Sequence, residues 1–296
     1  AAVLLAVELL LFEWKPRSLI PVALSSAVAA LLRPFLLGSG PMFPVAGHDV
    51  LPTADLLCAA GVGLIAGLLA LVLTMAVYAA EDVFHRLPIH WMWWPTIGGL
   101  AVGIGGLFQP RALGVGYDII GELLDGRYDA ASLAPLVLVK GLIWAIALGS
   151  GTSGGVLAPL LIMGGALGAI ESTFLPGGDR ALWPLVSMAA ALGGTMRSPL
   201  TSVVFALELT HDPNSLLALL IASTMAHGFT VLVMKRSILT EKVARRGFHI
   251  SREYATDPLE RLSVADVMSA DVASIPASLP VRDVMTRYFF GGGERR

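Results

Sequence analysis

Residues 149–168 read GSGTSGGVLAPLLIMGGALG, and this stretch decides the fold. It lies inside Gly141–Ile170, a run without Asp, Glu, Lys or Arg. As one helix this run would be about 45 Å long, which is too long for a single crossing of a bilayer core of about 30 Å. The glycines of Gly149–Gly155, followed by Pro159, break the run at its centre. We therefore predict two apolar helices that meet at a non-helical loop near membrane depth; the alternative is a short loop at the membrane surface.

The composition supports a membrane protein. Apolar residues make up 55% of the chain and charged residues 14%, whereas soluble domains carry about a quarter charged residues. The net charge of −2 offers no basic face for nucleic acid, and Cys58 is the single cysteine, so disulfides within the chain and thiol metal sites are excluded. The six histidines have no metal-ligand spacing, and we expect His85 and His90 to be solvated or interfacial.

Several other apolar stretches occur along the chain, and Leu56–Ala80, which has no charge, is long enough to span a bilayer with some tilt. The Trp91–Phe108 stretch contains Gly98, Gly99, Gly103, Gly105 and Gly106, and small residues of this kind let membrane helices approach closely. The stretches are Leu19–Leu37, Leu56–Ala80, Trp91–Phe108, Leu133–Ile170, Ala181–Met196 and Ser215–Met234.

The charges between the apolar stretches predict the orientation. A basic cluster follows Met234, with Lys235, Arg236, Lys242, Arg245 and Arg246. By the positive-inside rule, the C-terminal region is expected to be cytoplasmic. The connection containing His85, Arg86 and His90 is mildly basic and fits the same side, whereas residues 38–53 lack Lys and Arg and fit the outside.

A short internal repeat pairs two glutamates. Residues 1–10 (AAVLLAVELL) and 201–210 (TSVVFALELT) match at several positions with a constant offset of 200, and Glu8 corresponds to Glu208. Carboxylates in membrane segments are costly and are usually functional. Their duplication suggests a transporter built from two inverted halves. We expect each glutamate to cap the N-terminus of a neighbouring half-helix; a direct role in proton transfer is the alternative.

The glycine-rich break also suggests chemistry. A small anion inside a membrane needs stabilisation that is weak enough for it to leave again. Backbone N–H groups at a helix N-terminus supply partial positive charge and directed hydrogen bonds. Gly151–Gly155 can free such groups, and Val156, Leu157 and Ala158 open the next helix, with Pro159 tolerated in its first turn.

Four motifs, in order along the chain, resemble the CLC family of chloride channels and chloride/proton antiporters. The segment 149–168 resembles the family signature GSG-x-x-GG-[IV]-F-x-P-x-L, and residues 191–210 (ALGGTMRSPLTSVVFALELT) resemble the helix pair that follows it. Residues 113–120 (LGVGYDII) resemble a glycine-rich connection, and residues 236–247 (RSILTEKVARRG) resemble the last membrane helix. The resemblance implies an all-α, polytopic membrane fold of tilted, broken helices in an inverted repeat.

The resemblance also implies a site. The backbone amides of Val156 and Leu157 would coordinate the central chloride, and Gly154 and Gly155 would permit that geometry. The rest of the anion pathway loop would comprise Ser150, Gly151, Thr152, Ser153 and Pro159. The serine loop and the glutamate gate of the family belong to earlier sequence and are not among these residues.

Three positions depart from the family pattern. Leu157 replaces the signature phenylalanine but keeps its N–H. Leu239 stands where a tyrosine hydroxyl usually faces the chloride, so a donor is lost. Leu9 stands where antiporters often carry a second, inner glutamate. Leu9 therefore favours a channel-like or weakly proton-coupled pathway, with chloride/proton antiport as the alternative; voltage gating is a further implication of the resemblance.

The chain is expected to have two parts. Residues 1–248 would form the transport domain, and residues 249–296 a cytoplasmic linker with the beginning of a CBS domain. Residues 264–289 predict a strand, a turn with Pro276 and Pro280, and an amphipathic helix, as in CBS domains, which often bind adenine nucleotides. Such binding would need the complete CBS region, and no other cofactor is expected. The chain begins within an expected helix and stops after an amphipathic run, so we expect a fragment of a longer protein.

Two other classes of membrane protein fit the sequence less well. A CBS-regulated divalent cation transporter would need several oxygen ligands in the membrane, and the apolar runs offer only Glu8 and Glu208. An intramembrane enzyme would need paired catalytic groups at membrane depth, and His227 has no evident partner in the sequence. We therefore expect a multi-pass transport protein rather than an enzyme, with chloride as substrate, the lipid bilayer as surroundings and, by the resemblance, a homodimeric assembly.

Overall fold

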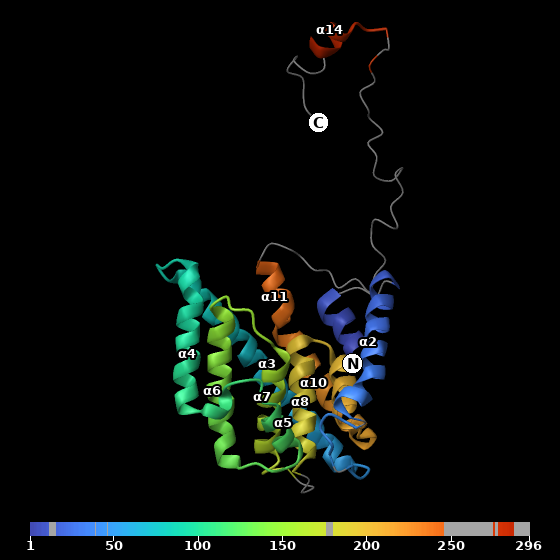
Figure 1. The fold of residues 1–296 in the computed structure, drawn as a ribbon, viewed down its shortest axis with the longest axis vertical. Coiled ribbons are helices and arrows are strands. Elements are labelled where there is room, and N and C mark those ends of the chain that lie inside the picture. Colours follow the sequence, from blue (N-terminus) through green and yellow to red (C-terminus); the bar gives the residue numbers. More distant parts are fainter. Residues whose placement is uncertain are drawn as a thin grey trace. The chain divides into compact units, whose positions relative to one another are not determined.

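The structure is a computed structural model that describes residues 1–11, 16–38, 40–45, 47–175, 180–245, 275 and 278–286. The chain divides into two units, Ala1–Arg252 and Glu253–Arg296. Every regular element within the described ranges is a helix (Figure 1). The predicted all-α bundle is therefore confirmed for the first unit.

The first unit contains short half-helices as well as long spans. In chain order its elements are α1 (Ala2–Leu5), the π-helix η1 (Ala6–Leu11), α2 (Pro16–Leu37), α3 (Thr53–Arg86), η2 (Trp91–Trp93), α4 (Trp94–Phe108), η3 (Pro110–Ala112), α5 (Tyr117–Leu124), α6 (Ala130–Gly149), α7 (Leu157–Glu171), α8 (Leu182–Met196), α9 (Pro199–Thr210), η4 (Pro213–Ser215), α10 (Leu216–Val233) and α11 (Ile238–Arg245).

Helix length separates the spans from the broken helices. Among the described residues, four stretches are long and apolar enough to cross a membrane: Pro16–Leu36, Thr53–Arg86, Ala130–Gly149 and Pro213–Glu241. By contrast, α7 and α8 have 15 residues each and α9 has 12. A helix of 15 residues is about 22 Å long and cannot cross a core of about 30 Å alone. The bundle therefore holds helix ends at membrane depth.

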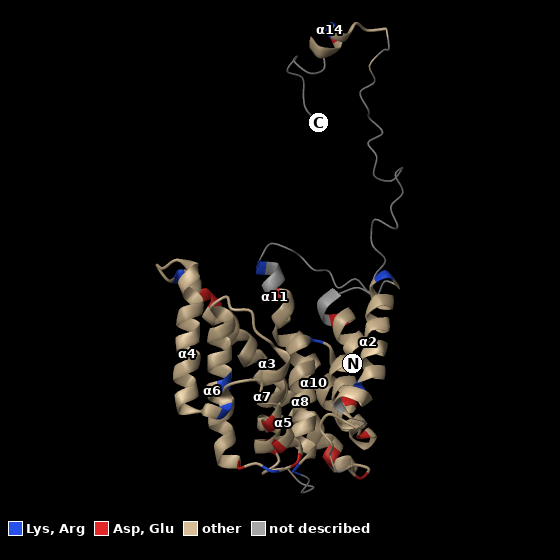
Figure 2. Cartoon of the chain, in the orientation of Figure 1, with Lys and Arg blue, Asp and Glu red and all other residues tan. Residues whose placement is uncertain are grey.

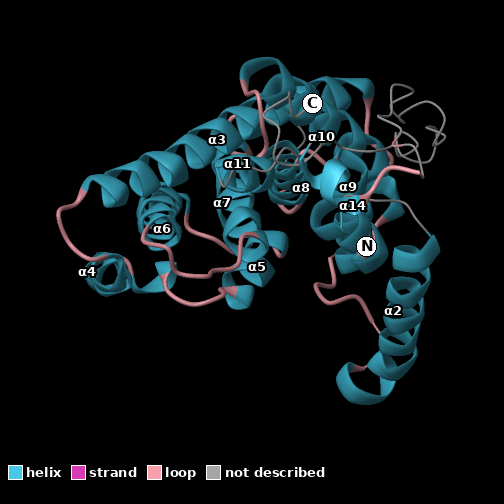
Figure 3. Ribbon diagram, turned by 90° about the horizontal axis from the view of Figure 1, so that it is seen from above, coloured by secondary structure: helices cyan, strands magenta, loops and turns pink. Residues whose placement is uncertain are grey.

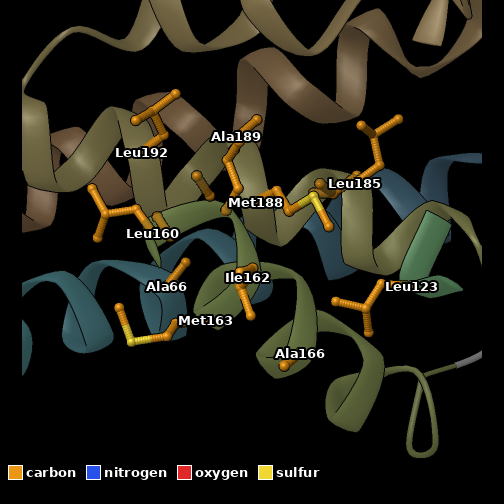
Figure 4. Close-up of a cluster of buried hydrophobic side chains, with 14 of the residues drawn as sticks. Ala66, Leu123, Leu160, Ile162, Met163, Ala166, Leu185, Met188, Ala189 and Leu192 are labelled. Carbon is orange, nitrogen blue, oxygen red and sulfur yellow. The ribbon is translucent and has the colours of Figure 1, made fainter. Parts of the chain in front are cut away.

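The core lies where α7, α8 and α3 meet. Leu160, Ile162 and Met163 of α7 and Leu192 of α8 are buried, and Figure 4 shows Met163 on the side of α7 that faces Ala66 of α3. Close approach requires glycine at Gly168, because a Cβ there would lie 2.3 Å from the carbonyl oxygen of Trp183 on α8. The apolar packing holds α7 through Leu160–Glu171, and the backbone N–H groups at its N-terminal end carry no side-chain cap.

The predicted glycine contacts of α4 are confirmed at some positions. A Cβ on Gly98 would meet Ser150 at the end of α6, and a Cβ on Gly105 would meet Ile143 within α6. Gly99 and Gly103 have open space instead. One glycine-rich face of α4 thus packs against α6, and the view from above places these two helices together at one flank (Figure 3).

Charged residues gather at the helix ends of the first unit, and the long apolar middles carry few (Figure 2). The end of α3 meets the end of α11, because Arg245 donates to Asp82 at 2.5 Å. On the other side, His48 of the connection between α2 and α3 contacts Asp212, which follows α9. The two basic segments therefore lie on one side of the bundle, as predicted, and the segment without Lys or Arg lies on the opposite side.

The second unit is described only at Ile275 and residues 278–286. Pro280 precedes the short helix α14 (Val281–Val284). The strand predicted for a CBS domain, and Pro276, lie outside the described residues.

Candidate functional site

The predicted break between two helices is present. Helix α6 ends at Gly149, and α7 begins at Leu157. Gly151 has φ +82°, the left-handed conformation that commonly terminates a helix and that residues with a Cβ disfavour. Residues 152–155 have no regular structure, and Val156 makes the bend into α7.

Side chains of α6 and of the loop hold the break in place. The hydroxyls of Ser150 and Thr152 both donate to the carbonyl oxygen of Ala147, Ser150 at 2.7 Å. From within α6, the indole Nε1 of Trp144 donates to the carbonyl oxygen of Gly155 at 3.1 Å. These bonds satisfy carbonyl groups rather than N–H groups, so they leave the donors at the start of α7 free for another acceptor.

The start of α7 is an uncharged, half-buried group of donors. Val156 is the N-cap, and no side chain caps the helix. The first described hydrogen bond of the helix runs from Leu160 N to Val156 O at 3.3 Å. The first N–H groups of an α-helix have no partner within it, and Pro159 has no N–H. The N–H groups of Leu157 and Ala158, with that of Val156 beside them, can therefore donate hydrogen bonds to a ligand with negative charge.

The depth of this helix start follows from its neighbours. The other end of α7, at Glu171, lies beside Ser172, whose hydroxyl bonds to Tyr128 at 2.8 Å. Tyr128 belongs to the connection between α5 and α6, on the side of the bundle that also holds residues 38–53. Because α7 spans only about 22 Å, its N-terminus stops short of the opposite surface. The predicted placement at membrane depth is therefore supported by helix length.

The left-handed conformation falls on Gly151, the first glycine of the Gly151–Gly155 run, and the role expected of Gly154 and Gly155 in freeing the amides stays a prediction. Neither has a left-handed φ, and the loop needs that conformation at Gly151 instead. A Cβ on Gly155 would meet nothing within 4 Å, whereas one on Gly154 would come 3.1 Å from Leu148. The sharp reversal therefore occurs directly after α6, within the glycine run that was expected to let the backbone turn.

Leu239 stands at the position of the usual pore tyrosine. It lies on α11, whereas the other predicted site residues lie in the loop before α7 and at the start of α7. It is the second residue of α11, an amphipathic helix of eight residues. Its side chain is half-buried and packs at the edge of the core. The expected last membrane helix is thus too short to cross a bilayer. Of the predicted site residues, the structure gathers Ser150–Leu157 and Pro159 in one loop and helix start.

Glu8 and Glu208 form reciprocal contacts that explain the repeat. Glu8 in η1 accepts from the hydroxyl of Thr201 in the first turn of α9. Glu208 in α9 accepts from the nitrogen of Ala1, directly before α1, at 2.6 Å. At the offset of 200, Ala1 corresponds to Thr201 and Glu8 to Glu208, so each glutamate contacts the residue that corresponds to the other's partner. The two segments therefore run antiparallel, and each glutamate lies at the start of the other segment. Glu8 accepts from a side-chain hydroxyl and not from a backbone N–H of α9, so the capping role stays a prediction.

Several contacts were missed by the sequence reasoning. Tyr78 donates to the carbonyl oxygen of Ile238, and Arg245 binds Asp82. His48 Nδ1 lies 2.5 Å from Asp212 Oδ2, and both side chains are buried. Each contact joins residues more than 150 positions apart, and no local pattern could have indicated it. The buried Lys140 was noticed only as a charge; it donates to the carbonyl oxygens of Ala112 and Gly114, each at 2.9 Å.

These features define a class. A polytopic helical membrane protein with antiparallel repeat segments and a helix N-terminus inside the bundle has the architecture of a secondary transport protein.

The comparisons identify the family. The family described as "Voltage gated chloride channel" matches residues 1–231, and the chain belongs to this CLC family. It is 30% identical to "Voltage-gated ClC-type chloride channel ClcB" of Salmonella typhimurium, over 77% of this chain and 55% of the relative. It is 32% identical to "Chloride channel protein CLC-e" of Arabidopsis thaliana, over 75% of this chain and 34% of that protein.

Solved structures share the fold. A slow cyanobacterial Cl⁻/H⁺ antiporter superposes with a TM-score of 0.69 at 20% identity, covering 78% of this chain and 56% of that one. A CLC-type fluoride/proton antiporter superposes with a TM-score of 0.67 at 20% identity, covering 80% of this chain and 58% of that one. The chain spans about half the length of the ClcB relatives and antiporter structures that it matches.

Proposed function

We propose that the full-length protein conducts chloride across a membrane, with the anion held by the backbone amides of Val156 and Leu157. The observation that carries this proposal is the uncapped start of α7 inside the bundle. Membership of the CLC family supports it, as do the relatives that are named chloride channels.

The chemistry of the site suits weak, reversible binding of chloride rather than tight binding. A lysine or arginine at this place would attract chloride strongly and slow its release. Residues 149–159 contain no charged side chain, so partial charges on N–H groups are the donors. Binding that is favourable enough for entry and weak enough for exit is what conduction requires.

Within this function we favour a channel-like or weakly proton-coupled pathway. Leu9 carries no titratable group at the place where antiporters of the family often have an inner glutamate. Leu239 removes one hydroxyl donor from the expected anion position, which should lower chloride affinity. Chloride/proton antiport is the second candidate, because antiporters are among the structures with this fold. Voltage gating is proposed with the channel-like function.

The test is reconstitution of the full-length protein in liposomes under a chloride gradient, with chloride release and internal pH recorded together. We expect chloride release without a fixed proportion of protons. Proton movement locked to chloride would establish the antiporter instead. Absence of chloride movement in active preparations that still bind anions would overturn the transport proposal.

Three further proposals belong to the whole protein. The C-terminus is cytoplasmic, because the basic residues that follow α10 lie on one side of the bundle with Arg86. The assembly is a homodimer with one pathway per subunit, in line with the family. An adenine nucleotide would bind only to a complete CBS region, and no other cofactor takes part.

A further inference from the structure

Helix α11 carries Leu239, and its first residue is attached to α3. The hydroxyl of Tyr78 on α3 donates to the carbonyl oxygen of Ile238. Tyr78 is buried, with 8% of its surface exposed, and Ile238 is buried as well. A hydrogen bond in such surroundings is costly to lose, because the carbonyl would remain without solvent. The residue next to Leu239 is therefore fixed in position.

The last residue of α11 is attached to the same stretch of α3. The guanidinium of Arg245 lies over the ring of Tyr78, 4.6 Å from its centroid. Arg245 Nη1 donates to Asp82 Oδ1 at 2.5 Å and lies 3.7 Å from Glu81 Oε2. Its Nε also donates to Glu241 within α11 at 3.3 Å. One cation thus combines two carboxylates of α3 with the face of an aromatic ring.

The spacing makes these contacts a two-point attachment. Tyr78 and Asp82 are four residues apart and share one face of α3, while Ile238 and Arg245 are the two ends of α11. Fixing both ends of a helix sets its position and its rotation. The attachment consequently determines which way Leu239 points.

We propose that Tyr78, Asp82 and Arg245 form a clamp that positions α11 and thereby sets the inner side of the anion pathway at Leu239. This inference rests on the proposed function, because it needs Leu239 to border the anion. The clamp residues do not touch the anion; they act through α11. Leu239 has no donor of its own and acts by excluding water. Releasing the clamp lets Leu239 move away and lets water compete for the N–H groups, so the anion is bound less tightly.

The experiment uses the full-length protein in liposomes and four variants. Tyr78→Phe removes the hydroxyl and keeps the ring under Arg245. Asp82→Arg and Arg245→Asp each break the ion pair, and the double variant D82R/R245D restores opposite charges in exchanged places. The control is Arg236→Gln, because Arg236 pairs with Glu241 at 3.4 Å within the same segment without reaching α3.

Two quantities are measured for each variant: the half-saturating chloride concentration for flux, and the hydrogen exchange of residues 238–245. Loss of one buried hydrogen bond corresponds to about a two- to tenfold change in binding. We expect a rise of this size in half-saturating chloride for Tyr78→Phe. For Asp82→Arg and Arg245→Asp, whose ion pair is exposed, we expect a smaller rise of up to about fivefold. Exchange in α11 should be faster in all three variants. The double variant should recover most of the wild-type half-saturating chloride concentration and most of the wild-type hydrogen exchange. Arg236→Gln should change neither quantity.

The outcomes separate the two proposals. Faster exchange with unchanged half-saturation would mean that the contacts only stabilise the fold, and the positioning role would be refuted. Unchanged exchange in all three single variants would refute the clamp itself. Wild-type protein that moves no chloride would refute the proposed function, and the role of Leu239 with it, whatever the exchange shows.

Discussion

At the scale of single residues, the N–H of Leu157 is the most direct test of the site. An ester in place of the Val156–Leu157 peptide bond removes this donor and keeps every side chain. Hydrogen bonds to charged groups contribute about 1.5–3 kcal/mol, so we expect the half-saturating chloride concentration to rise about tenfold or more. The measurement is chloride flux against chloride concentration in liposomes.

The matched control for this change is an ester at Leu161, whose N–H lies in the interior of α7. That ester removes an N–H that is used within the helix and leaves the N–H groups of Val156, Leu157 and Ala158 in place. Equal effects of the two esters on half-saturating chloride would show that the start of α7 is not an anion site.

Gly151 and Gly155 differ in what a methyl group would do. Gly151 has φ +82°, and an L-residue in this conformation costs about 1–2 kcal/mol. Gly155 has an ordinary φ and open space around its Cα. We expect Gly151→Ala to lower the midpoint of thermal unfolding in detergent clearly and Gly155→Ala to leave it nearly unchanged. The reverse order would place the strained backbone at Gly155 rather than at Gly151.

The sequence predicted the break in the long apolar run better than it predicted the details of the break. Seven residues of glycine, serine and threonine exclude a continuous helix, so the ends at Gly149 and Leu157 could be foreseen. Which glycine takes the left-handed conformation depends on how Trp144 and Ala147 hold the loop, and those contacts are tertiary.

At the scale of helices, the close approach of α3 and α10 requires glycine at Gly63. A Cβ on Gly63 would lie 2.4 Å from the carbonyl oxygen of Ala222, which is backbone and cannot rotate away. Gly63→Ala must push the helices apart, and overpacking of this kind costs about 1–3 kcal/mol. We expect a lower unfolding midpoint in detergent and reduced chloride flux.

Gly61 offers the control on the same helix. A Cβ there meets nothing within 4 Å, and alanine is favoured over glycine in a helix interior by about 1 kcal/mol. Gly61→Ala should therefore keep or raise the unfolding midpoint. If both variants lost stability equally, the effect would come from the helix itself rather than from its packing on α10.

The pairing of helices shows where reading the sequence reaches its limit. Apolar stretches and their ends follow from local composition, and the glycine face of α4 was predicted as a packing face. The local sequence, however, does not predict that Tyr78 contacts Ile238 or that His48 contacts Asp212. The repeat is the exception: the matching letters of residues 1–10 and 201–210 predicted related surroundings for Glu8 and Glu208, and each glutamate lies at the start of the other segment.

At the scale of the whole molecule, the two sides of the bundle have different charge, and this difference predicts how the protein sits in a membrane. Arg86, Lys235, Arg236 and Arg245 lie on the side where α3 ends and α11 begins. Residues 38–53 on the other side contain no Lys or Arg. Basic residues next to membrane segments are retained in the cytoplasm, so we expect the connection with Asp49 to face outward.

Single cysteines test this orientation directly. In a Cys58→Ser background, Asp49→Cys and His90→Cys place a thiol in an exposed connection on each side. A membrane-impermeant maleimide added to intact cells should label Cys at 49 and not Cys at 90, while disrupted cells should show both labelled. Labelling of position 90 alone would show that the protein has the opposite orientation in the membrane. It would also put the clamp between α3 and α11 on the outer surface, which is incompatible with Leu239 bordering the inner side of the pathway.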